Sequence, residues 1–325
     1  MTQIVVADIG GTHARFALAE VQGGRVISLD KELVFPTSDH ASFGSAWRSF
    51  GEALDQALPT SAAIAIAGPV EDDLIRFTNN PWTISPKSVA QDLGLRAHLL
   101  LNDFAAVAHA VAHASARHFV HICGPTAPLP ASGTICVIGP GTGLGVAQLH
   151  RADLAYSVIA TEGGHIGYAP TDEFDDAILR GLRTSLGRVP AERVVSGAGL
   201  GRIYNALVAN EGEAIRELGD AELWSLALSG TDRLATAALD RFCMALGSVA
   251  GDLALAQGAA AVVIAGGLGY RLREHLLRPE FAARFCAKGR FEEMMRSMPV
   301  KLIVHPQPGL FGAAAAFATR NKSTA

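Results

Sequence analysis

The hydrophobic pattern of the first eighteen residues predicts two β-strands joined by a tight glycine turn. Apart from Asp8, apolar strand formers run through Ile4–Ile9 and most of Ala14–Leu18. Gly10-Gly11-Thr12 stands between the two runs. Because strand formers flank the turn on both sides, we expect a hairpin. The common phosphate-binding loops instead lead from a strand into a helix, and no G-x-x-x-x-G-K-[ST] sequence occurs in the chain.

Two explanations of this turn remain open from its residues alone. Consecutive glycines allow backbone N–H groups to converge on an anion. The Asp8 carboxylate beside them is badly placed to touch phosphate directly, but it suits a magnesium ion that binds the phosphate. An ordinary tight hairpin with an aspartate at the surface explains the same residues equally well.

The rest of the N-terminal half alternates between buried strands and helices. The pattern predicts, in order, a strand over Val26–Glu32 that ends near Pro36, a helix over Ser42–Leu58, a strand over Ala62–Ala67, a loop at Pro81 and Pro86, a short helix near Ser88–Leu93, a strand over His98–Leu101 and a helix over Phe104–His113. Such alternation is typical of an α/β fold with a mixed or parallel sheet.

The second half begins with the same strand–glycine–strand pattern as the first. A strand is expected over Thr134–Ile138, a glycine turn over Gly139–Gly145 and a returning strand over Val146–Leu149. This similarity predicts a duplicated architecture with a cleft between the two halves.

Helices dominate the remainder of the chain. The expected elements are a helix over Phe174–Leu186, a helix over Gly199–Ala209 capped by Ser196, a helix over Thr231–Gln257 ending at Gly258, a strand over Ala260–Ala265 leading into a glycine turn over Gly266–Gly269, a strand over Val300–Val304 and a helix over Gly309–Arg320. No low-complexity linker interrupts this pattern, so we expect a hinge at the domain boundary.

Composition narrows the class of protein. Hydrophobic residues make up 49% of the 325 residues and charged residues 18%, as in a well-buried globular protein. The net charge of −4 and the pI near 6.3 argue against nucleic-acid binding. The chain has no run of 18 apolar residues and no signal-peptide pattern, so we expect no membrane partner and a cytoplasmic location.

The four cysteines are scattered singly along the chain. They form neither a C-x-x-C zinc pattern nor a disulfide framework. We expect buried thiols in a reducing compartment rather than reactive groups. The residues are Cys123, Cys136, Cys243 and Cys286.

Three glycine turns form the first set of candidate functional residues. The segments Asp8–Thr12, Gly139–Gly145 and Gly266–Gly269 all lie where a buried strand ends. The first two are suited to offer N–H groups to phosphates, and the third allows an adenosine to approach the backbone. Tight turns alone would explain any one of them, but they do not require the hydroxyl groups of Thr12 and Thr142.

Asn102-Asp103 ends a buried strand and begins a helix, which allows two roles for the aspartate. Aspartate at a helix N-terminus is commonly only a cap. The end of a strand in an α/β sheet is also where functional sites form. An aspartate there can accept the proton of a substrate hydroxyl, as phosphoryl transfer by kinases requires.

Further polar side chains could bind a polyhydroxylated ligand. Glu162-Gly163-Gly164-His165 places a carboxylate and an imidazole around two glycines, and Glu192 adds another acceptor. Zinc binding by His165 is an alternative, although a lone histidine is more often structural. Asn79 and Asn80 are typical turn formers, and their loop position also allows contact with a sugar.

Together these motifs resemble the bacterial ATP-dependent glucokinases of the hexokinase/actin-like ATPase superfamily, nearly from end to end. The motifs that carry the resemblance are Asp8–Arg15 and Ile138–Gly145 as phosphate signatures, Leu101–Phe104 as the catalytic-base segment, Glu162–His165 and Ala191–Gly197 as sugar-binding segments, and Lys288–Phe291 and Pro308–Gly312. Each motif is weak alone, and their combination is specific.

The resemblance implies a two-domain α/β fold of the actin-like ATPase (ribonuclease-H-like) type with an interdomain cleft. The small domain would comprise residues 1–113 plus 305–325, and the large domain residues 114–304. The implied activity is transfer of a phosphoryl group from ATP, with Mg²⁺, to the 6-hydroxyl of D-glucose. The products would be glucose 6-phosphate and ADP, as the first step of glucose use in glycolysis. A homodimer is implied as well.

The resemblance also implies residue roles. Asp103 would be the general base, and Asp8 would face Mg²⁺ through water. Sugar hydroxyls would be bound by Asn102, Asp103, Glu162, His165, Glu192 and Asn79. ATP would be bound by Ala7, Asp8, Ile9, Gly10, Gly11, Thr12, Gly141, Thr142, Gly143, Gly266 and Gly267. In the related ROK group the equivalent histidine helps to bind zinc beside a cysteine cluster. This chain lacks that cluster, so no zinc is expected and His165 is assigned to the sugar.

Two other functions remain open. One is a kinase for another hexose, such as mannose or an N-acetylated amino sugar. The other is a sugar sensor that binds glucose and a protein partner without catalysis, although Asp103 and the glycine turns argue against it.

Overall fold

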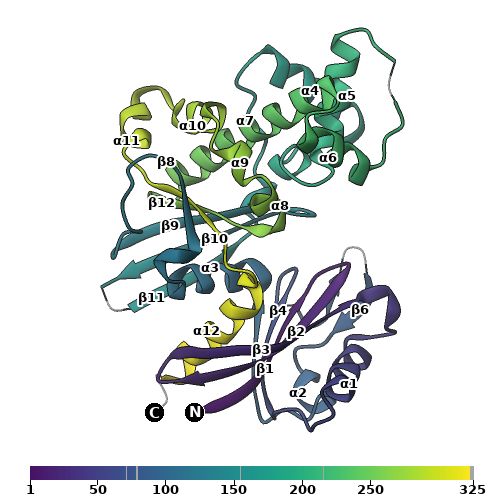
Figure 1. The fold of residues 1–325 in the computed structure, drawn as a ribbon, viewed down its shortest axis with the longest axis vertical. Helices are drawn as coiled ribbons and strands as arrows, with labels where there is room; N and C mark the ends of the chain where they lie inside the picture. The colour runs from purple at the N-terminus through teal and green to yellow at the C-terminus, as the bar shows by residue number, and fades with distance from the viewer. Residues whose placement is uncertain (71, 78–79, 154, 215, 323–325) are drawn as a thin grey trace. The chain divides into compact units, whose positions relative to one another are not determined.

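The structure is a computed structural model that describes all residues except 71, 78–79, 154, 215 and 323–325 (Figure 1). Its contacts divide the chain into two compact units. Unit 1 comprises Met1–Ser115 and His305–Ala325, and unit 2 comprises Ala116–Val304. Each unit has its own sheet and its own hydrophobic core, with helices packed on the sheet, as the predicted α/β class requires.

The sheet of unit 1 has five strands in the order β3-β2-β1-β4-β7. The strands are β1 (Thr2–Ile9), β2 (His13–Gln22), β3 (Arg25–Pro36), β4 (Ser61–Ile66) and β7 (Ala97–Asn102). The first three form an antiparallel meander, whereas β1, β4 and β7 are parallel. Ile9 is paired with Ile66 and Ile66 with Asn102, so the three parallel strands end in one row.

The two faces of β1 belong to different cores because side chains alternate along a strand. Val5 and Ala7 pack with α1 (Phe43–Leu54), whereas Ile4 and Val6 pack with α12 (Pro308–Lys322). The α12 face also includes residues of α3 (Asp103–His113). The short helix α2 (Val89–Asp92) adds Val89 to the α1 core, and the 3-10 turn η1 (Thr37–Asp39) follows β3.

Two details of unit 1 differ from the prediction. Helix α1 ends at Leu54, before the predicted Leu58, because Asp55 adopts a left-handed conformation with φ 50°. The predicted loop at Pro81 and Pro86 contains a hairpin of β5 (Ile75–Phe77) and β6 (Asn80–Ile84). The buried Asn80, Trp82 and Ile84 alternate with exposed residues, and Pro81 is tolerated because the hairpin is only two strands wide.

The sheet of unit 2 repeats this topology. Its order is β11-β10-β9-β12-β13-β8, in which the first five strands correspond to β3-β2-β1-β4-β7. The strands are β8 (Phe119–Cys123), β9 (Gly133–Pro140), β10 (Leu144–Ala152), β11 (Ala155–Thr161), β12 (Ala259–Ile264) and β13 (Val300–Ile303). Equivalent hydrogen bonds lie at the ends of β1 and β9. The Ala67 N–H donates to the Ile9 carbonyl, and the Ala265 N–H donates to the Ile138 carbonyl. The repeated topology supports the predicted duplication.

The long, largely buried helix α7 of unit 2 packs chiefly against α5, α6 and α10. The helices of this unit are α4 (Glu173–Leu186), α5 (Gly199–Asn210), α6 (Asp220–Ser229), α7 (Arg233–Ala256), α8 (Gly266–Arg271), α9 (Arg273–Leu276), α10 (Pro279–Cys286) and α11 (Glu292–Arg296), with 3-10 turns η2 (Ala116–His118), η3 (Gly163–His165), η4 (Ala191–Arg193) and η5 (Gly289–Phe291). Gly247 permits the close approach of α10 to α7, because a methyl group at this position would lie 2.4 Å from the Phe281 carbonyl oxygen. Lys288 joins the two helices through Asp252, with Nζ 2.7 Å from Oδ1.

Several sequence predictions in unit 2 are wrong. Ser196 does not cap α5, because Ala198 occupies the N-cap position without a side-chain hydrogen bond. Gly266–Gly269 is the first turn of α8, because the chain turns directly from β12 into this helix. The prediction missed α6, α9, α10, α11, β8 and β11. Strand β11 has no buried residue: exposed and half-buried positions alternate along most of it, so its hydrophobic signal is weak.

The four cysteines are free thiols. Burial raises the pKa of Cys136 and of Cys243 to about 12. Thiols with such pKa values stay protonated at neutral pH, so these two cysteines are not nucleophiles.

No helix in the described part of the chain combines the length and the apolar composition needed to cross a bilayer.

Candidate active site

Thr37 stabilises the first glycine turn through hydrogen bonds to the backbone carbonyls of the turn. The Gly10 N–H donates to the His13 carbonyl at 3.0 Å and closes the hairpin. The Thr37 hydroxyl donates to the Gly11 carbonyl, and the Thr37 N–H donates to the Thr12 carbonyl, both at 3.0 Å. Because N–H and C=O point in opposite directions in a trans peptide, the Thr12 N–H points away from Thr37. The turn is therefore fixed with this donor available on its other side.

Asp8 lies across the hairpin from Arg15 in the ladder of β1 and β2. The Asp8 side chain is 22% exposed, and Arg15 Nη1 lies 3.6 Å from its Oδ2, beyond ordinary hydrogen-bonding distance. Burial raises the pKa of Asp8, and the positive charge of Arg15 opposes this effect only in part. The carboxylate is therefore incompletely compensated and suited to a further cation.

A hydrated magnesium ion fits this environment. Mg²⁺ is usually held by one or two carboxylates together with substrate phosphates and water. Among the described residues no group of three or more His, Cys, Asp or Glu side chains is placed to hold a metal. A single carboxylate, Asp8, beside the glycine turn suits a magnesium site in which phosphate and water, rather than further protein side chains, supply the other ligands.

Asn102, rather than Asp103, is the N-cap of α3. Its Oδ1 accepts hydrogen bonds from Phe104 N–H at 2.9 Å and Ala105 N–H at 3.0 Å, and its Nδ2 donates to the Gly68 carbonyl at 3.3 Å. Asp103 occupies the first helical position, is half-buried, and accepts only the Phe104 N–H of these two, through Oδ1 at 2.8 Å. The capping explanation that the sequence allowed for Asp103 therefore belongs chiefly to its neighbour.

The row of strand ends brings the polar residues of unit 1 to one edge of the sheet. Ile9 and Asn102 flank Ile66 in the same row, so they are two strand spacings apart, or about 10 Å. Asp8 comes just before this row, and Asp103 just after it. The structure thus brings the predicted phosphate turn and the predicted base segment together.

The second and third glycine segments meet at the corresponding edge in unit 2. The Gly141 N–H donates to the Gly143 carbonyl at 2.8 Å, and the Gly197 N–H donates to the Gly141 carbonyl at 2.7 Å. Gly266 has a left-handed φ of 83°, and a methyl group there would lie 2.9 Å from the Pro140 carbonyl oxygen. The start of α8 is therefore in contact with the end of β9.

The turn that carries Glu162 and His165 packs on the start of β10. A methyl group at Gly164 would lie 2.1 Å from the Leu144 carbonyl oxygen, so only glycine permits this approach. His165 Nε2 lies 4.0 Å from Glu162 Oε2, and the two side chains are 56% and 64% exposed. Both polar groups are accessible to a ligand.

Glu192 reaches the same strand from η4. Its Oε2 accepts a hydrogen bond from Leu144 N–H at 3.1 Å. A methyl group at Gly143 would lie 2.5 Å from the same oxygen. The backbone of this segment is tied to the Glu162 turn, because Ala191 N–H donates to the Ile166 carbonyl at 2.8 Å. Glu162, His165 and Glu192 are therefore assembled around the second glycine turn.

The structure groups the predicted site residues by unit. Unit 1 contains Ala7, Asp8, Ile9, Gly10, Gly11, Thr12, Asn102 and Asp103, and unit 2 contains Gly141, Thr142, Gly143, Glu162, His165, Glu192, Gly266 and Gly267. Asn79 lies outside the described residues. Sequence reasoning missed Thr37, whose burial behind the first turn has no local sequence signal. It named Gly309 only within the Pro308–Gly312 motif and gave it no role, although a methyl group there would lie 2.6 Å from Asp8 Oδ2.

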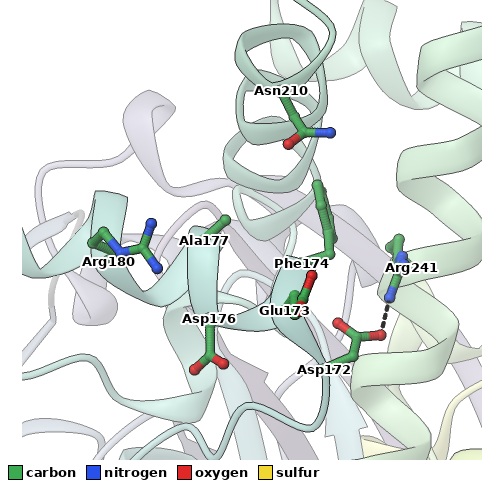
Figure 2. A pocket seen from close by; sticks show the side chains of 8 residues that line it. All are labelled: Asp172, Glu173, Phe174, Asp176, Ala177, Arg180, Asn210 and Arg241. Carbon is green, nitrogen blue, oxygen red and sulfur yellow. Dashed lines mark hydrogen bonds and ion pairs between the residues drawn. The ribbon is translucent and has the colours of Figure 1, made fainter.

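A cavity of about 740 Å³ lies beside the start of α4, and none of the predicted site residues lines it (Figure 2). The Arg241 guanidinium lies 4.7 Å from the centre of the Phe174 ring, and Asp172 pairs with both Arg241 and Arg284. Burial favours a higher pKa of Asp172, but the Asp175 N–H and the two arginines lower it overall. These contacts anchor α4 rather than form a reactive centre. The lining residues are Asp172, Glu173, Phe174, Asp176, Ala177, Arg180, Asn210 and Arg241.

Comparison with known proteins gives consistent similarities over nearly the whole chain. The family model described as Glucokinase matches residues 5–320. The chain is 56% identical to a glucokinase of Zymomonas mobilis, over 98% of both chains.

Solved structures give the same result. The structure superposes on a glucokinase from an Antarctic psychrotroph with a TM-score of 0.83, at 35% identity and over 97% of this chain and 98% of that one. A ROK-family glucokinase from Streptomyces griseus, in complex with glucose and AMPPNP, gives a TM-score of 0.62 at 20% identity, over 97% of this chain and 98% of that one. These similarities confirm the predicted α/β fold of the actin-like ATPase type.

The raised pKa of Asp8 predicts how a neutral substitution changes stability. A raised pKa means that the ionised carboxylate favours the unfolded chain at neutral pH. Asp8→Asn is therefore expected to increase the free energy of unfolding at pH 7 by about 1 kcal/mol. The gain should shrink as the pH falls through the raised pKa, where the folded wild-type carboxyl becomes protonated.

Denaturant unfolding at several pH values measures this effect. Asp30→Asn is the matched control, because Asp30 is exposed on β3 of the same sheet. Its effect should stay within about 0.5 kcal/mol. A loss of stability in Asp8→Asn at pH 7 would contradict the prediction.

Proposed function

This chain belongs to the glucokinase family of enzymes, and from that premise we propose that it transfers the γ-phosphoryl group of ATP to the 6-hydroxyl of D-glucose. The products are glucose 6-phosphate and ADP, and the reaction is the first step of glucose use in glycolysis. The Streptomyces griseus relative, which was solved with glucose and AMPPNP, supports this pair of substrates. The same proposal includes that the enzyme forms a homodimer and is located in the cytoplasm.

The observation that carries the proposal is the shared row of strand ends in unit 1. It holds the glycine turn with Asp8 about 10 Å from the segment with Asp103. Phosphoryl transfer depends mainly on positioning and on stabilisation of charge, with little covalent assistance from the protein. A donor-lined turn and a separate carboxylate on one rigid sheet edge supply those two requirements.

Asp103 acts as the general base in this proposal. Asn102 Oδ1 is the principal cap of α3, and it shares the Phe104 N–H with Oδ1 of Asp103. The Asp103 carboxylate accepts the proton of the 6-hydroxyl as the oxygen attacks the γ-phosphorus and the bond from phosphorus to the β-phosphate bridging oxygen breaks. The proton therefore goes to the carboxylate, and the negative charge leaves with ADP.

The remaining assigned residues hold the two substrates. Gly11 and Thr12 in unit 1 offer backbone and hydroxyl donors to the phosphates, and Gly10, whose N–H closes the hairpin, lines the same turn. Residues 141–143 and 266–267 in unit 2 hold the rest of the nucleotide. When bound at Asp8, Mg²⁺ stabilises the negative charge on the transferring phosphoryl group.

Sugar hydroxyls are bound by Asn102, Glu162, His165 and Glu192, with Asn79 as a further contact. Asn102 Oδ1 is used by the helix, and Nδ2 donates one of its two hydrogens to the Gly68 carbonyl, so the second Nδ2 hydrogen is the one suited to a sugar hydroxyl. The exposed carboxylate of Glu162 and the imidazole of His165 supply an acceptor and a second polar group. A sugar with a missing or inverted hydroxyl would leave such groups unmatched, which is costly.

A coupled assay of ADP release over a panel of sugars tests the function. We expect turnover with D-glucose, and a much lower kcat/KM with mannose and N-acetylglucosamine. A higher kcat/KM with another hexose would assign the enzyme to that sugar. Glucose binding by calorimetry without ATP turnover would instead identify a sugar sensor.

Asp103→Ala should lower kcat by about 10²–10⁴-fold, because the proton acceptor is lost. Glucose binding, measured by calorimetry, should persist. Asn102→Ala is the contrasting variant, since loss of the N-cap should lower stability by about 1 kcal/mol. Near-normal turnover of folded Asp103→Ala would exclude this residue as the base.

Gly143→Ala should raise the KM for glucose by about tenfold, although the residue lies in the nucleotide turn. The added methyl group would displace the Glu192 carboxylate and its hydrogen bond to Leu144, and a hydrogen bond to a charged group contributes about 1.5–3 kcal/mol.

Gly141→Ala is the matched control within the same turn, because no atom lies within 4 Å of an added methyl group. It should leave the KM for glucose unchanged and affect only the KM for ATP. Equal glucose KM values for the two variants would show that Glu192 does not contact the sugar through this arrangement.

A further inference from the structure

Gly309, in the first turn of α12, lies directly against the side chain of Asp8. A methyl group at Gly309 would lie 2.6 Å from Oδ2 and 2.8 Å from Cγ of Asp8, closer than non-bonded atoms approach. Gly309 belongs to a regular helix and has no left-handed φ. The space taken by the Asp8 carboxylate, rather than the backbone conformation, therefore requires glycine at this position.

A second glycine fixes α12 to the helix that begins with Asp103. A methyl group at Gly312 would lie 1.7 Å from the carbonyl oxygen of Ala106 and 3.0 Å from the backbone nitrogen of Ala110. Both atoms belong to the backbone of α3, which cannot move aside as a flexible side chain can. The crossing of α12 and α3 is therefore tightly constrained.

Helix α12 also packs on the strand that carries Asp8. Its buried residues share one core with the inward side chains Ile4 and Val6 of β1. The contributing α12 residues include Leu310, Ala313, Ala314 and Phe317. This packing leaves α12 little freedom to withdraw from Asp8, because protein cores are close-packed.

We infer that α12 sets the position of the Asp8 carboxylate, with Gly309 as the positioning residue that leaves room for it. The inference rests on the proposed function and names the ligand of this carboxylate as a hydrated divalent cation bound to nucleotide phosphates. Through Gly312 the same helix fixes Asp8 relative to the helix of Asp103. Groups that position a metal-binding residue typically change metal affinity or activity by about 10–100-fold when altered.

Gly309→Ala tests the inference through the magnesium dependence of nucleotide binding. Calorimetry with AMPPNP, once with Mg²⁺ and once with EDTA, gives the gain in affinity that the metal provides. We expect this gain to fall by about tenfold in Gly309→Ala, with the affinity in EDTA and the affinity for glucose unchanged. Gly181→Ala is the matched control, because Gly181 lies within α4 and has no atom within 4 Å of an added methyl group. Its gain should equal that of the wild-type protein.

A double-mutant cycle in denaturation measures the steric contact without any ligand. Gly309→Ala should lower the denaturation midpoint in the wild-type background, and the loss should disappear in Asp8→Ala, which lacks the carboxylate. If Gly309→Ala alone does not fold, recovery of the folded state in the double variant supports the contact equally.

Three results would overturn the inference. They are an equal midpoint loss in both backgrounds, an unchanged magnesium gain in folded Gly309→Ala, and the absence of a magnesium gain in the wild-type protein. Failure of the wild-type protein to phosphorylate glucose would overturn the proposed function alone. The nucleotide-binding and denaturation measurements would still decide the role of Gly309.

Discussion

The parallel pairing of β1, β4 and β7 is the constraint on which the candidate site of unit 1 depends. A shift of one residue in this pairing would send every side chain of the moved strand to the opposite face of the sheet. The buried faces of β1 exclude such a shift, because Val5 and Ala7 belong to one core and Ile4 and Val6 to another. Packing on both faces thus fixes the positions of the polar residues at the strand ends.

Close backbone contacts play the equivalent part in unit 2. Gly164 lies on the Leu144 carbonyl, and the Glu192 carboxylate accepts the Leu144 N–H. One residue at the start of β10 therefore supports two of the segments assigned to the sugar. The turn assigned to the nucleotide and the segments assigned to the sugar are in direct contact, so a change in one is expected to displace the other.

Much of the sheet framework could be predicted from the sequence, because buried strands such as β4 and β12 are short apolar runs bounded by turn residues. Strand β11 was missed because none of its residues is buried and the apolar Ile159 stands among its exposed positions. The roles of neighbouring residues were also beyond local reasoning. Either Asn102 or Asp103 can cap a helix, and only the hydrogen bonds of α3 distinguish them.

Contacts between distant parts of the chain account for the rest of what the sequence did not predict. Asp8 and Gly309 are about 300 residues apart in the chain, and Thr37 supports the first turn from the far end of β3. No pattern within a short window can indicate that a glycine is required by a carboxylate elsewhere. The residues that the structure brings together in unit 1 are those that follow neighbouring strands of one sheet.

The duplicated topology allows a residue-by-residue comparison of its two copies. Matching hydrogen bonds make Ile138 the counterpart of Ile9, so Val137 is the counterpart of Asp8. One copy therefore carries a charge where the other carries a buried valine. This asymmetry gives two similar hairpins different chemistry, with an ionisable group at one and an apolar side chain at the other. A fold built by repetition can thus become chemically asymmetric through a single side chain.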